Sequence, residues 1–208
     1  KVILNYLSLL GWNPDSEKEI FDQNELINSF QFKQVQKKSA VFDEKKLLWI
    51  SQQHLSEMSV RDLMNEIYTL NPEWGDGLEW DYLKEVVKLI KDRSKTITEI
   101  TSMSEIFFKD KLEYDIDLLN KTFNDKSIAI IKDFQSALST IEDWSRVEIE
   151  KIFEDIMEQH EVAIGQVMKP VRVAISGIPF GPGIFDLILL LGKEICQIRL
   201  RHALSVIQ

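Results

Sequence analysis

The chain has 208 residues and a formal net charge of −9, from 25 Lys and Arg against 34 Asp and Glu. This length can bury a sizeable core in one domain or in two small ones, and the negative charge argues against a general nucleic-acid binder because a negative surface repels phosphate. Cys196 is the single cysteine, which excludes disulfide frameworks and cysteine-based metal sites and favours the reducing cytosol as the compartment.

The first sixty residues are expected to combine short helices with a loop at about 33–42. Lys1 leads at once into an apolar, periodic segment at 2–10, so we interpret the sequence as part of a longer protein without a secretion leader. Ser16 and Glu19 have the spacing of a capping box, in which a hydroxyl accepts from the backbone N–H three residues later. This pair predicts a helix start.

Residues 61–140 are expected to be helical. Ser59 and Asp62 form a second capping-box pair, and the Gly/Pro-containing stretch 71–77 separates two helices. Apolar residues then recur at helical spacing in two groups, which are Tyr82, Leu83, Val86, Val87, Ile90, Ile97 and Ile100, and Ile130, Ile131, Phe134, Ala137, Leu138 and Ile141. Strand-like alternation is almost absent, so the predicted fold class is all-α.

The last segment, 141–208, is expected to begin near Ser145 and Glu148, a third capping-box pair. Its stretch 177–183 is dense in Gly and Pro and predicts an unusual backbone between two apolar segments. Residues 161–208 carry five basic side chains against three acidic ones, a local charge of +2 that leaves −11 on 1–160. Any nucleic-acid surface is therefore expected to be local. The apolar run 184–191 is far shorter than the roughly 20 residues that span a bilayer, so no membrane segment is predicted.

No self-contained active site is predicted. His54, His160 and His202 lie far apart and outside any metal-ligand spacing. The sequence has no phosphate-binding Gly-rich loop, no dinucleotide fingerprint and no nucleophile elbow. No catalytic residue and no metal ligand is assigned.

Two stretches resemble a known family. The first runs from Asn5 to Pro14 (NYLSLLGWNP) and continues with KSAVFD at 38–43; it resembles the segment after the second ATP-binding signature of bacterial-type glutamate–tRNA ligases. The second, with RVAISG at 172–177, GPGIF at 181–185 and LGKE at 191–194, resembles the end of that family's anticodon-binding region. Between them, KDRSKTI at 91–97 resembles the family's basic, Thr-containing turn. Ser51 and His54 depart from the usual Asn and Tyr.

The resemblance implies part of a class I aminoacyl-tRNA synthetase, an enzyme that attaches glutamate to tRNA and uses ATP and Mg²⁺. Its nucleotide-binding domain would precede Lys1, so this chain is expected to hold no cofactor and not to charge tRNA by itself. The implied division is a stem-contact segment at 1–60 and helical anticodon-binding subdomains at 61–140 and 141–208. The implied partner is glutamate tRNA, without DNA or membrane, for a cytoplasmic monomer; use of glutamine tRNA as a second substrate stays open.

The resemblance implies that Arg172, Pro182, Gly183 and Ile184 bind the anticodon. A guanidinium can stack on an unstacked base and donate to its edge, and Pro170 in a first helical turn would put Arg172 near a helix amino terminus, where phosphate is favoured. Glycine permits close backbone approach, and Ile184 would offer an apolar surface to a base. The alternatives are an exposed arginine on a solvated helix and an ordinary helix-capping loop.

The resemblance also implies that Arg93 reads the third anticodon base. Its alternative role is to stabilise a helix end as one more charge in the run 91–95. Lys169, Lys193 and Arg199 are secondary candidates for contacts with the tRNA backbone, although Lys193 and Arg199 on an amphipathic helix are commonly surface residues that extend into solvent.

The aromatic residues are expected to serve mainly the core. Tryptophan at helical spacing beside Leu and Ile is more often buried than displayed for stacking, so none of the five is assigned to a site: Trp12, Trp49, Trp74, Trp80 and Trp144. The competing function is an acidic, all-helical protein-interaction module without RNA contact, which the net charge favours on physical grounds.

Overall fold

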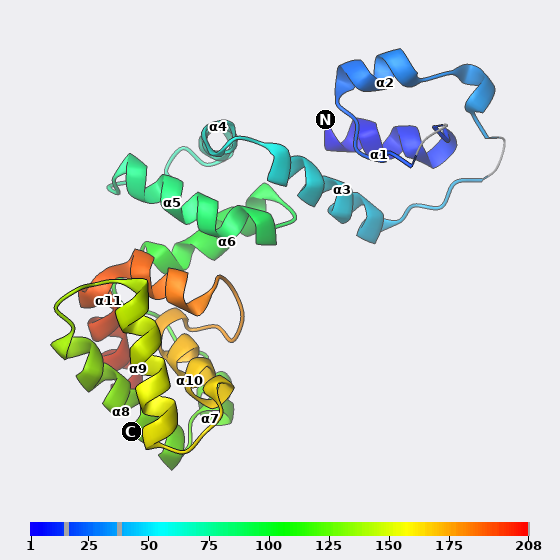
Figure 1. Cartoon of the computed structure of the whole chain (residues 1–208). Coiled ribbons are helices and arrows are strands. Elements are labelled where there is room, and N and C mark those ends of the chain that lie inside the picture. The colour runs from blue at the N-terminus through cyan, green and yellow to red at the C-terminus, as the bar shows by residue number, and fades with distance from the viewer. Residues whose placement is uncertain (15–16, 37–38, 208) are drawn as a thin grey trace. The chain divides into compact units, whose positions relative to one another are not determined.

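The computed structural model describes residues 1–14, 17–36 and 39–207 (Figure 1). Within these ranges every regular element is helical, and an isolated antiparallel bridge pairs Trp12 with Val35. The all-α prediction is confirmed. The chain forms two compact units, which we name unit 1 (Lys1–Asp76 with Ile90–Ser102) and unit 2 (Gly77–Leu89 with Met103–Gln208).

Unit 1 begins with three helices and a small core cluster beside the first two of them. Its elements are α1 (Val2–Gly11), α2 (Gln23–Ser29), η1 (Phe32–Gln34), α3 (Glu44–Glu57), α4 (Val60–Leu70), η2 (Lys91–Arg93) and most of α6 (Ile97–Ser104). Helix α1 packs on α2 and α3, with Trp12, Phe21 and Leu26 buried together. Burying one such side chain contributes on the order of 1.5–3 kcal/mol, so this cluster holds the start of the chain together.

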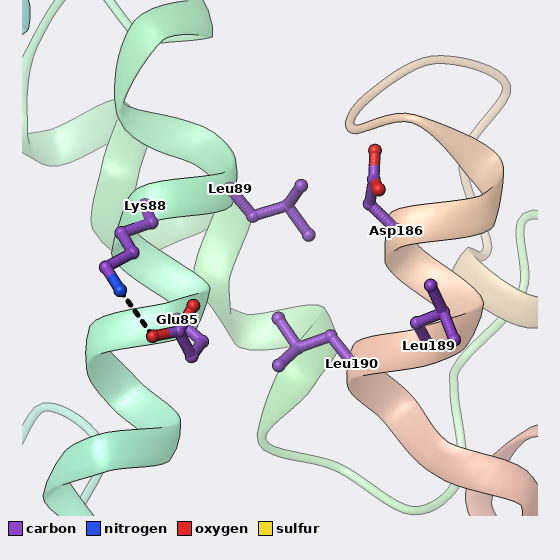
Figure 2. Close-up of a pocket in the computed structure, with 6 residues that line it drawn as sticks. All are labelled: Glu85, Lys88, Leu89, Asp186, Leu189 and Leu190. Atoms are coloured by element: carbon purple, nitrogen blue, oxygen red, sulfur yellow. Dashed lines mark hydrogen bonds and ion pairs between the residues drawn. The ribbon is translucent and has the colours of Figure 1, made fainter. Parts of the chain in front are cut away.

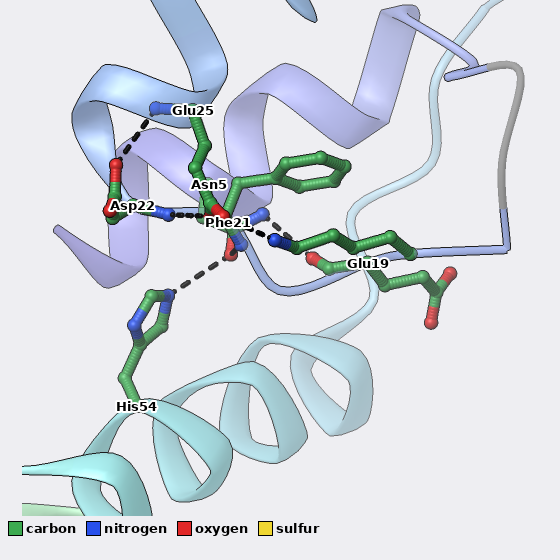
Figure 3. Close-up of polar contacts among 7 residues, drawn as sticks. Asn5, Glu19, Phe21, Asp22, Glu25 and His54 are labelled. Atoms are coloured by element: carbon green, nitrogen blue, oxygen red, sulfur yellow. Dashed lines mark hydrogen bonds and ion pairs between the residues drawn. The ribbon is translucent and has the colours of Figure 1, made fainter.

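The buried amide of Asn5 connects three segments of unit 1 (Figure 3). Its Nδ2 donates to the Glu19 carbonyl oxygen over 2.9 Å, and its Oδ1 accepts the Phe21 backbone N–H over 3.0 Å. His54 Nε2 on α3 lies 3.0 Å from the same Oδ1. Because Oδ1 can only accept, Nε2 of His54 carries the hydrogen. This network satisfies a polar side chain that would otherwise be costly to bury.

Unit 2 is a packed set of longer helices. It contains most of α5 (Trp80–Ile90), then η3 (Glu105–Phe107), α7 (Ile116–Thr122), α8 (Asp125–Thr140), α9 (Arg146–Gln159), α10 (Ile164–Ser176) and α11 (Ile184–Ile207). Helices α8, α9, α10 and α11 pack against one another, and the Phe134 and Phe153 rings lie 4.8 Å apart in their core. The backbone of α11 leaves helical geometry at Gly192, where φ is 79°.

The predicted helix starts have different outcomes. Ser59 precedes α4 and its side chain accepts from the Asp62 backbone N–H, as predicted. Ser145 precedes α9, but its side chain makes no capping hydrogen bond. Ser16 lies outside the described residues. The apolar pattern at 82–100 belongs to two helices rather than one, because the chain turns at η2, where the Ser94 hydroxyl donates to the Ile90 carbonyl oxygen over 3.0 Å.

The division into units does not follow a linear order along the chain. Unit 1 takes residues 90–102 from within the predicted segment 61–140, and unit 2 takes the rest of that segment after residue 76. The segments 1–60, 61–140 and 141–208 therefore stay predictions about domains. Among the described helices, none combines the length and apolar character needed to cross a membrane.

Candidate functional site

Arg172 lies near the carboxyl-terminal end of α10, which corrects one step of the sequence argument. Helix α10 begins at Ile164, and Pro170 stands inside it rather than in its first turn. The expected proximity of Arg172 to a helix amino terminus is therefore wrong. The carboxyl-terminal end of a helix carries partial negative charge and favours a cation, so the arginine suits its position for a different reason.

The side chain of Arg172 reaches across the loop that follows α10. Its Nη1 donates to the Pro182 carbonyl oxygen over 2.7 Å, and the side chain is half-buried. Gly181 has a φ of 135°, a conformation that side chains rarely adopt, and a Cβ at this position would lie 3.9 Å from Arg172 Nη1. The loop backbone thus passes close to the guanidinium. Arg172 therefore lies against the backbone at Pro182, and the role of Arg172, Pro182 and Gly183 in binding an anticodon stays a prediction.

Ile184 does not provide the apolar surface that was expected of it. Its side chain is 4% exposed and belongs to the core at the start of α11, and Pro182 is buried too. Phe180, in contrast, is 70% exposed in the middle of the same loop. An exposed aromatic ring can stack on a base. The sequence reasoning missed Phe180, although a single aromatic residue between Pro179 and Gly181, in a loop with no apolar periodicity, was a usable signal.

Arg199 is not a phosphate-binding residue, which corrects the sequence prediction. Its side chain is 0% exposed. Nη1 donates to the Ile175 carbonyl oxygen over 2.8 Å, and Nη2 donates to the carbonyl oxygens of Ile106 and Lys109. Burial lowers the pKa of this guanidinium from its usual range. The charge is enclosed by backbone oxygens and cannot meet RNA in this arrangement.

The two lysine candidates differ. Lys193 Nζ donates to the Ile141 carbonyl oxygen over 2.7 Å, at the residue that ends α8, so this ammonium is engaged in holding a helix end. Lys169 is exposed and, with Lys126, lines a pocket of about 210 Å³ beside the first turns of α8 and α10. Of the secondary candidates, Lys169 is therefore the one whose position suits contact with phosphate.

Arg93 is exposed on η2, a short turn that is fixed to other parts of unit 1. Lys91 Nζ donates to the carbonyl oxygens of Ser56 and Met58, each over 2.9 Å, and Gln52 Nε2 donates to the Asp92 carbonyl oxygen over 3.1 Å. These bonds hold the turn at the end of α3. Arg93 belongs to unit 1 and Arg172 to unit 2, so each is described as a separate surface.

A larger pocket of about 480 Å³ lies in unit 2 and is not lined by any predicted site residue (Figure 2). Its lining combines Leu89, Leu189 and Leu190 with two carboxylates. Glu85 pairs with Lys88, and Asp186 accepts from Arg146 Nη1 over 2.7 Å. The lining carries two carboxylates and one ammonium, that of Lys88, so it has no excess of positive charge with which to bind phosphate.

The described residues offer no group of three or more side chains that could hold a metal ion. His54 bonds to Asn5, and His160 Nε2 lies 2.7 Å from Asp133 Oδ2, so both have structural contacts. Burial raises the pKa of the Cys196 thiol to about 12, and a thiol that stays protonated is a poor nucleophile.

Two of the five tryptophans are core residues as expected. Trp12 and Trp74 are buried, and Trp144 is half-buried with its indole N–H donating to the Leu189 carbonyl oxygen. The expectation is wrong for Trp49 and Trp80, which are 40% and 45% exposed.

Comparison with known families defines the class of protein. Residues 50–204 match the family model described as an anticodon binding domain, and residues 1–49 match the model described as the catalytic domain of class I tRNA synthetases (E and Q). The first match covers more than half of the chain, and the chain belongs to this anticodon-binding-domain family. The start of the predicted stem-contact segment 1–60 thus falls within the family's catalytic-domain model.

The relatives are, more particularly, glutamate–tRNA ligases. The chain is 31% identical over 207 residues to the glutamate–tRNA ligase of Flavobacterium johnsoniae, covering 100% of the chain and 41% of that protein. It is 35% identical over 215 residues to that of Desulforudis audaxviator, covering 99% and 43%. The chain thus spans about two fifths of the length of these curated relatives.

Solved structures agree with this family. A glutamate tRNA ligase from Elizabethkingia meningosepticum, crystallised with its amino acid, superposes with a TM-score of 0.86 at 25% identity, covering 100% of this chain and 41% of that one. The resemblance seen in the sequence is confirmed. These matches give no support to the alternative of an acidic protein-interaction module.

Proposed function

We propose that this chain recognises the anticodon of glutamate tRNA as part of a glutamate–tRNA ligase. The observation that carries the proposal is the closure of Arg172 onto the Pro182 carbonyl oxygen, in a segment that matches the anticodon binding domain family. A guanidinium already oriented beside a backbone loop loses little freedom when it donates to a base. The proposed anticodon-binding residues are Arg93, Arg172, Pro182, Gly183 and Phe180.

The local charge supports a confined RNA surface. Arg199 is buried and Lys193 bonds to the Ile141 carbonyl oxygen, so the cations of 161–208 that we propose for contact with RNA are Lys169 and Arg172. Unstacked bases are recognised by stacking and edge hydrogen bonds more than by many phosphate contacts. An acidic protein can therefore bind an anticodon loop where a few donors and one exposed ring are concentrated.

The whole ligase would attach glutamate to its tRNA in a reaction that consumes ATP with Mg²⁺. The described residues of this chain do not fit a nucleotide–metal site, since they include no cluster of metal ligands, and no step of that chemistry is assigned to them. We propose a cytoplasmic monomer that binds glutamate tRNA and neither DNA nor membrane.

The test measures binding of the purified chain to a glutamate tRNA transcript by fluorescence anisotropy, over a range of salt concentrations. A transcript with all three anticodon bases replaced is the matched control. We expect the replaced anticodon to weaken binding by about tenfold to a hundredfold, the scale of one good base contact. Equal affinity for the two transcripts would reject anticodon recognition, whatever the salt dependence.

A further inference from the structure

The carboxyl-terminal end of α10 is held by side chains from two distant segments of unit 2. The last carbonyl groups of a helix have no partner within it. Here the Ala174 carbonyl oxygen lies 2.6 Å from the Tyr114 hydroxyl, and the Ile175 carbonyl oxygen accepts from Arg199 Nη1 over 2.8 Å. The Gly177 N–H donates to the Val173 carbonyl oxygen over 2.9 Å. Three successive carbonyl groups are therefore satisfied.

Arg199 does more than cap this helix. Its second nitrogen, Nη2, donates to the carbonyl oxygens of Ile106 and Lys109, at η3 and just after it. One planar guanidinium on α11 thus joins the end of α10 to the segment at η3, which lies about ninety residues before Arg199 in the sequence. Lysine could not reproduce this, because its ammonium is a single point donor group without the fork of an arginine. Arg199 is also a cation at the negative end of the helix dipole.

The fixed helix end leads directly into the loop of the candidate site. Ser176 Oγ lies 2.8 Å from the Arg172 carbonyl oxygen and 3.1 Å from the Ile178 carbonyl oxygen, so it joins the helix to the loop. Gly177 then turns the chain with a φ of 73°. Arg172 closes the far side through Pro182. The loop therefore has two anchors, the Arg172 side chain and the end of α10.

We infer that Arg199, together with Tyr114, is a positioning residue that holds Arg172 and the loop 177–183 in the arrangement that meets the anticodon. The inference rests on the proposed function for its effect on tRNA. Arg199 does not touch RNA, because its side chain is enclosed. Its contribution passes through the backbone carbonyl groups of α10.

The first test is hydrogen exchange of backbone amides in the Arg199→Lys variant of the whole chain. We expect exchange at 177–183 to accelerate by about tenfold or more, while amides in the middle of α9 keep their rates, since loosening confined to one segment raises exchange there alone. Arg201→Lys, an exposed arginine on the same helix, is the matched control and should leave both regions unchanged. Unchanged exchange at 177–183, or equal acceleration throughout unit 2, would overturn the inference. If Arg199→Lys fails to fold, Tyr114→Phe, which removes only the hydroxyl, is measured in its place under the same criteria.

The second test asks whether the positioning acts through Arg172. The dissociation constant for the glutamate tRNA transcript is measured for Arg199→Lys in the wild-type and in the Arg172→Ala backgrounds. We expect a weakening of about tenfold in the first background and less than about twofold in the second, because the two changes share one interaction. The same loss in both backgrounds would contradict positioning of Arg172. If the wild-type chain binds no tRNA, the proposed function fails, and the exchange experiment still decides the role of Arg199.

Discussion

Arg172 Nη1 donates a hydrogen bond to the Pro182 carbonyl oxygen over 2.7 Å, which ties the end of α10 to the start of α11. This bond holds the half-buried guanidinium against the backbone of the loop 177–183. The residue therefore has two functions that can be separated by mutation, one in the geometry of the loop and one in binding a base.

Arg172→Ala is expected to weaken binding of glutamate tRNA by about 1–3 kcal/mol, the scale of one good base contact. The loss of a single partly buried hydrogen bond should lower the free energy of unfolding by only about 1 kcal/mol. Anisotropy and urea unfolding measure the two quantities. Arg201→Ala, a change of an exposed arginine on α11, is the control. A large fall in stability with unchanged affinity would make Arg172 purely structural.

Arg93→Gln is expected to reduce discrimination at the third anticodon base. Cytosine presents the acceptors O2 and N3 on its Watson–Crick edge, where guanine presents the N2–H and N1–H donors, and a guanidinium can only donate. The amide of glutamine can turn to match either base. In the full-length ligase, the ratio of kcat/KM for transcripts with C or G at that base should narrow by about tenfold to a hundredfold. An unchanged ratio would remove Arg93 from the site.

Lys169 and Lys193 should respond in opposite ways to replacement by methionine. Lys169 is exposed, so Lys169→Met should weaken tRNA binding and reduce the salt slope by about 1 without loss of stability. Lys193 bonds to the carbonyl oxygen at the end of α8, so Lys193→Met should cost about 1 kcal/mol of stability and leave the salt slope unchanged. Salt titration of binding and urea unfolding of both variants test this contrast; reversed responses would contradict the positions described for the two side chains.

His54 is expected to make unit 1 less stable in mild acid. Burial lowers its pKa below the ordinary value of 6.5, so the folded state disfavours the protonated ring. The stability contribution is present above about pH 6.5 and is lost as the pH falls toward the lowered pKa, because unfolding then takes up a proton.

His54→Gln tests this pH dependence, since its amide can still donate to Asn5 Oδ1 but does not titrate. Urea unfolding at about pH 7.5 and about pH 5.5, on either side of the ordinary histidine pKa, should show a smaller loss of stability for His54→Gln than for the wild type. An identical loss would exclude His54 as the titrating group.

Gly177→Ala is expected to destabilise unit 2 by about 1–2 kcal/mol, because φ is 73° at this residue and a Cβ is unfavourable in the left-handed region. The contacts that a Cβ would meet are ordinary, the nearest being Leu112 Cδ1 at 3.7 Å, so the cost would be conformational. Gly165→Ala, near the start of the same helix with open space around it, should change stability by less than about 0.5 kcal/mol. Thermal unfolding compares the two; equal melting temperatures would contradict the argument.

The local features of this protein could be predicted from the sequence because they depend on residues close together in the chain. Apolar spacing at 130–141 predicted the buried side of α8, and the Ser59 hydroxyl three residues before the Asp62 carboxylate predicted the start of α4. The Gly/Pro-rich stretch 177–183 predicted an unusual backbone, and two of its residues do have positive φ. The family resemblance came from short motifs and needed no coordinates.

The burial and the hydrogen-bond partners of individual side chains depend instead on packing between segments far apart in the sequence. Arg199 is a residue type that usually lies on the surface. It is buried here because α11 packs against the end of α10 and against the segment at η3, where three carbonyl oxygens accept from its guanidinium. Ile184 is buried and Phe180 exposed in one loop for the same reason. A motif specifies which residues are present, whereas burial and hydrogen-bond partners are decided by the elements that pack around them.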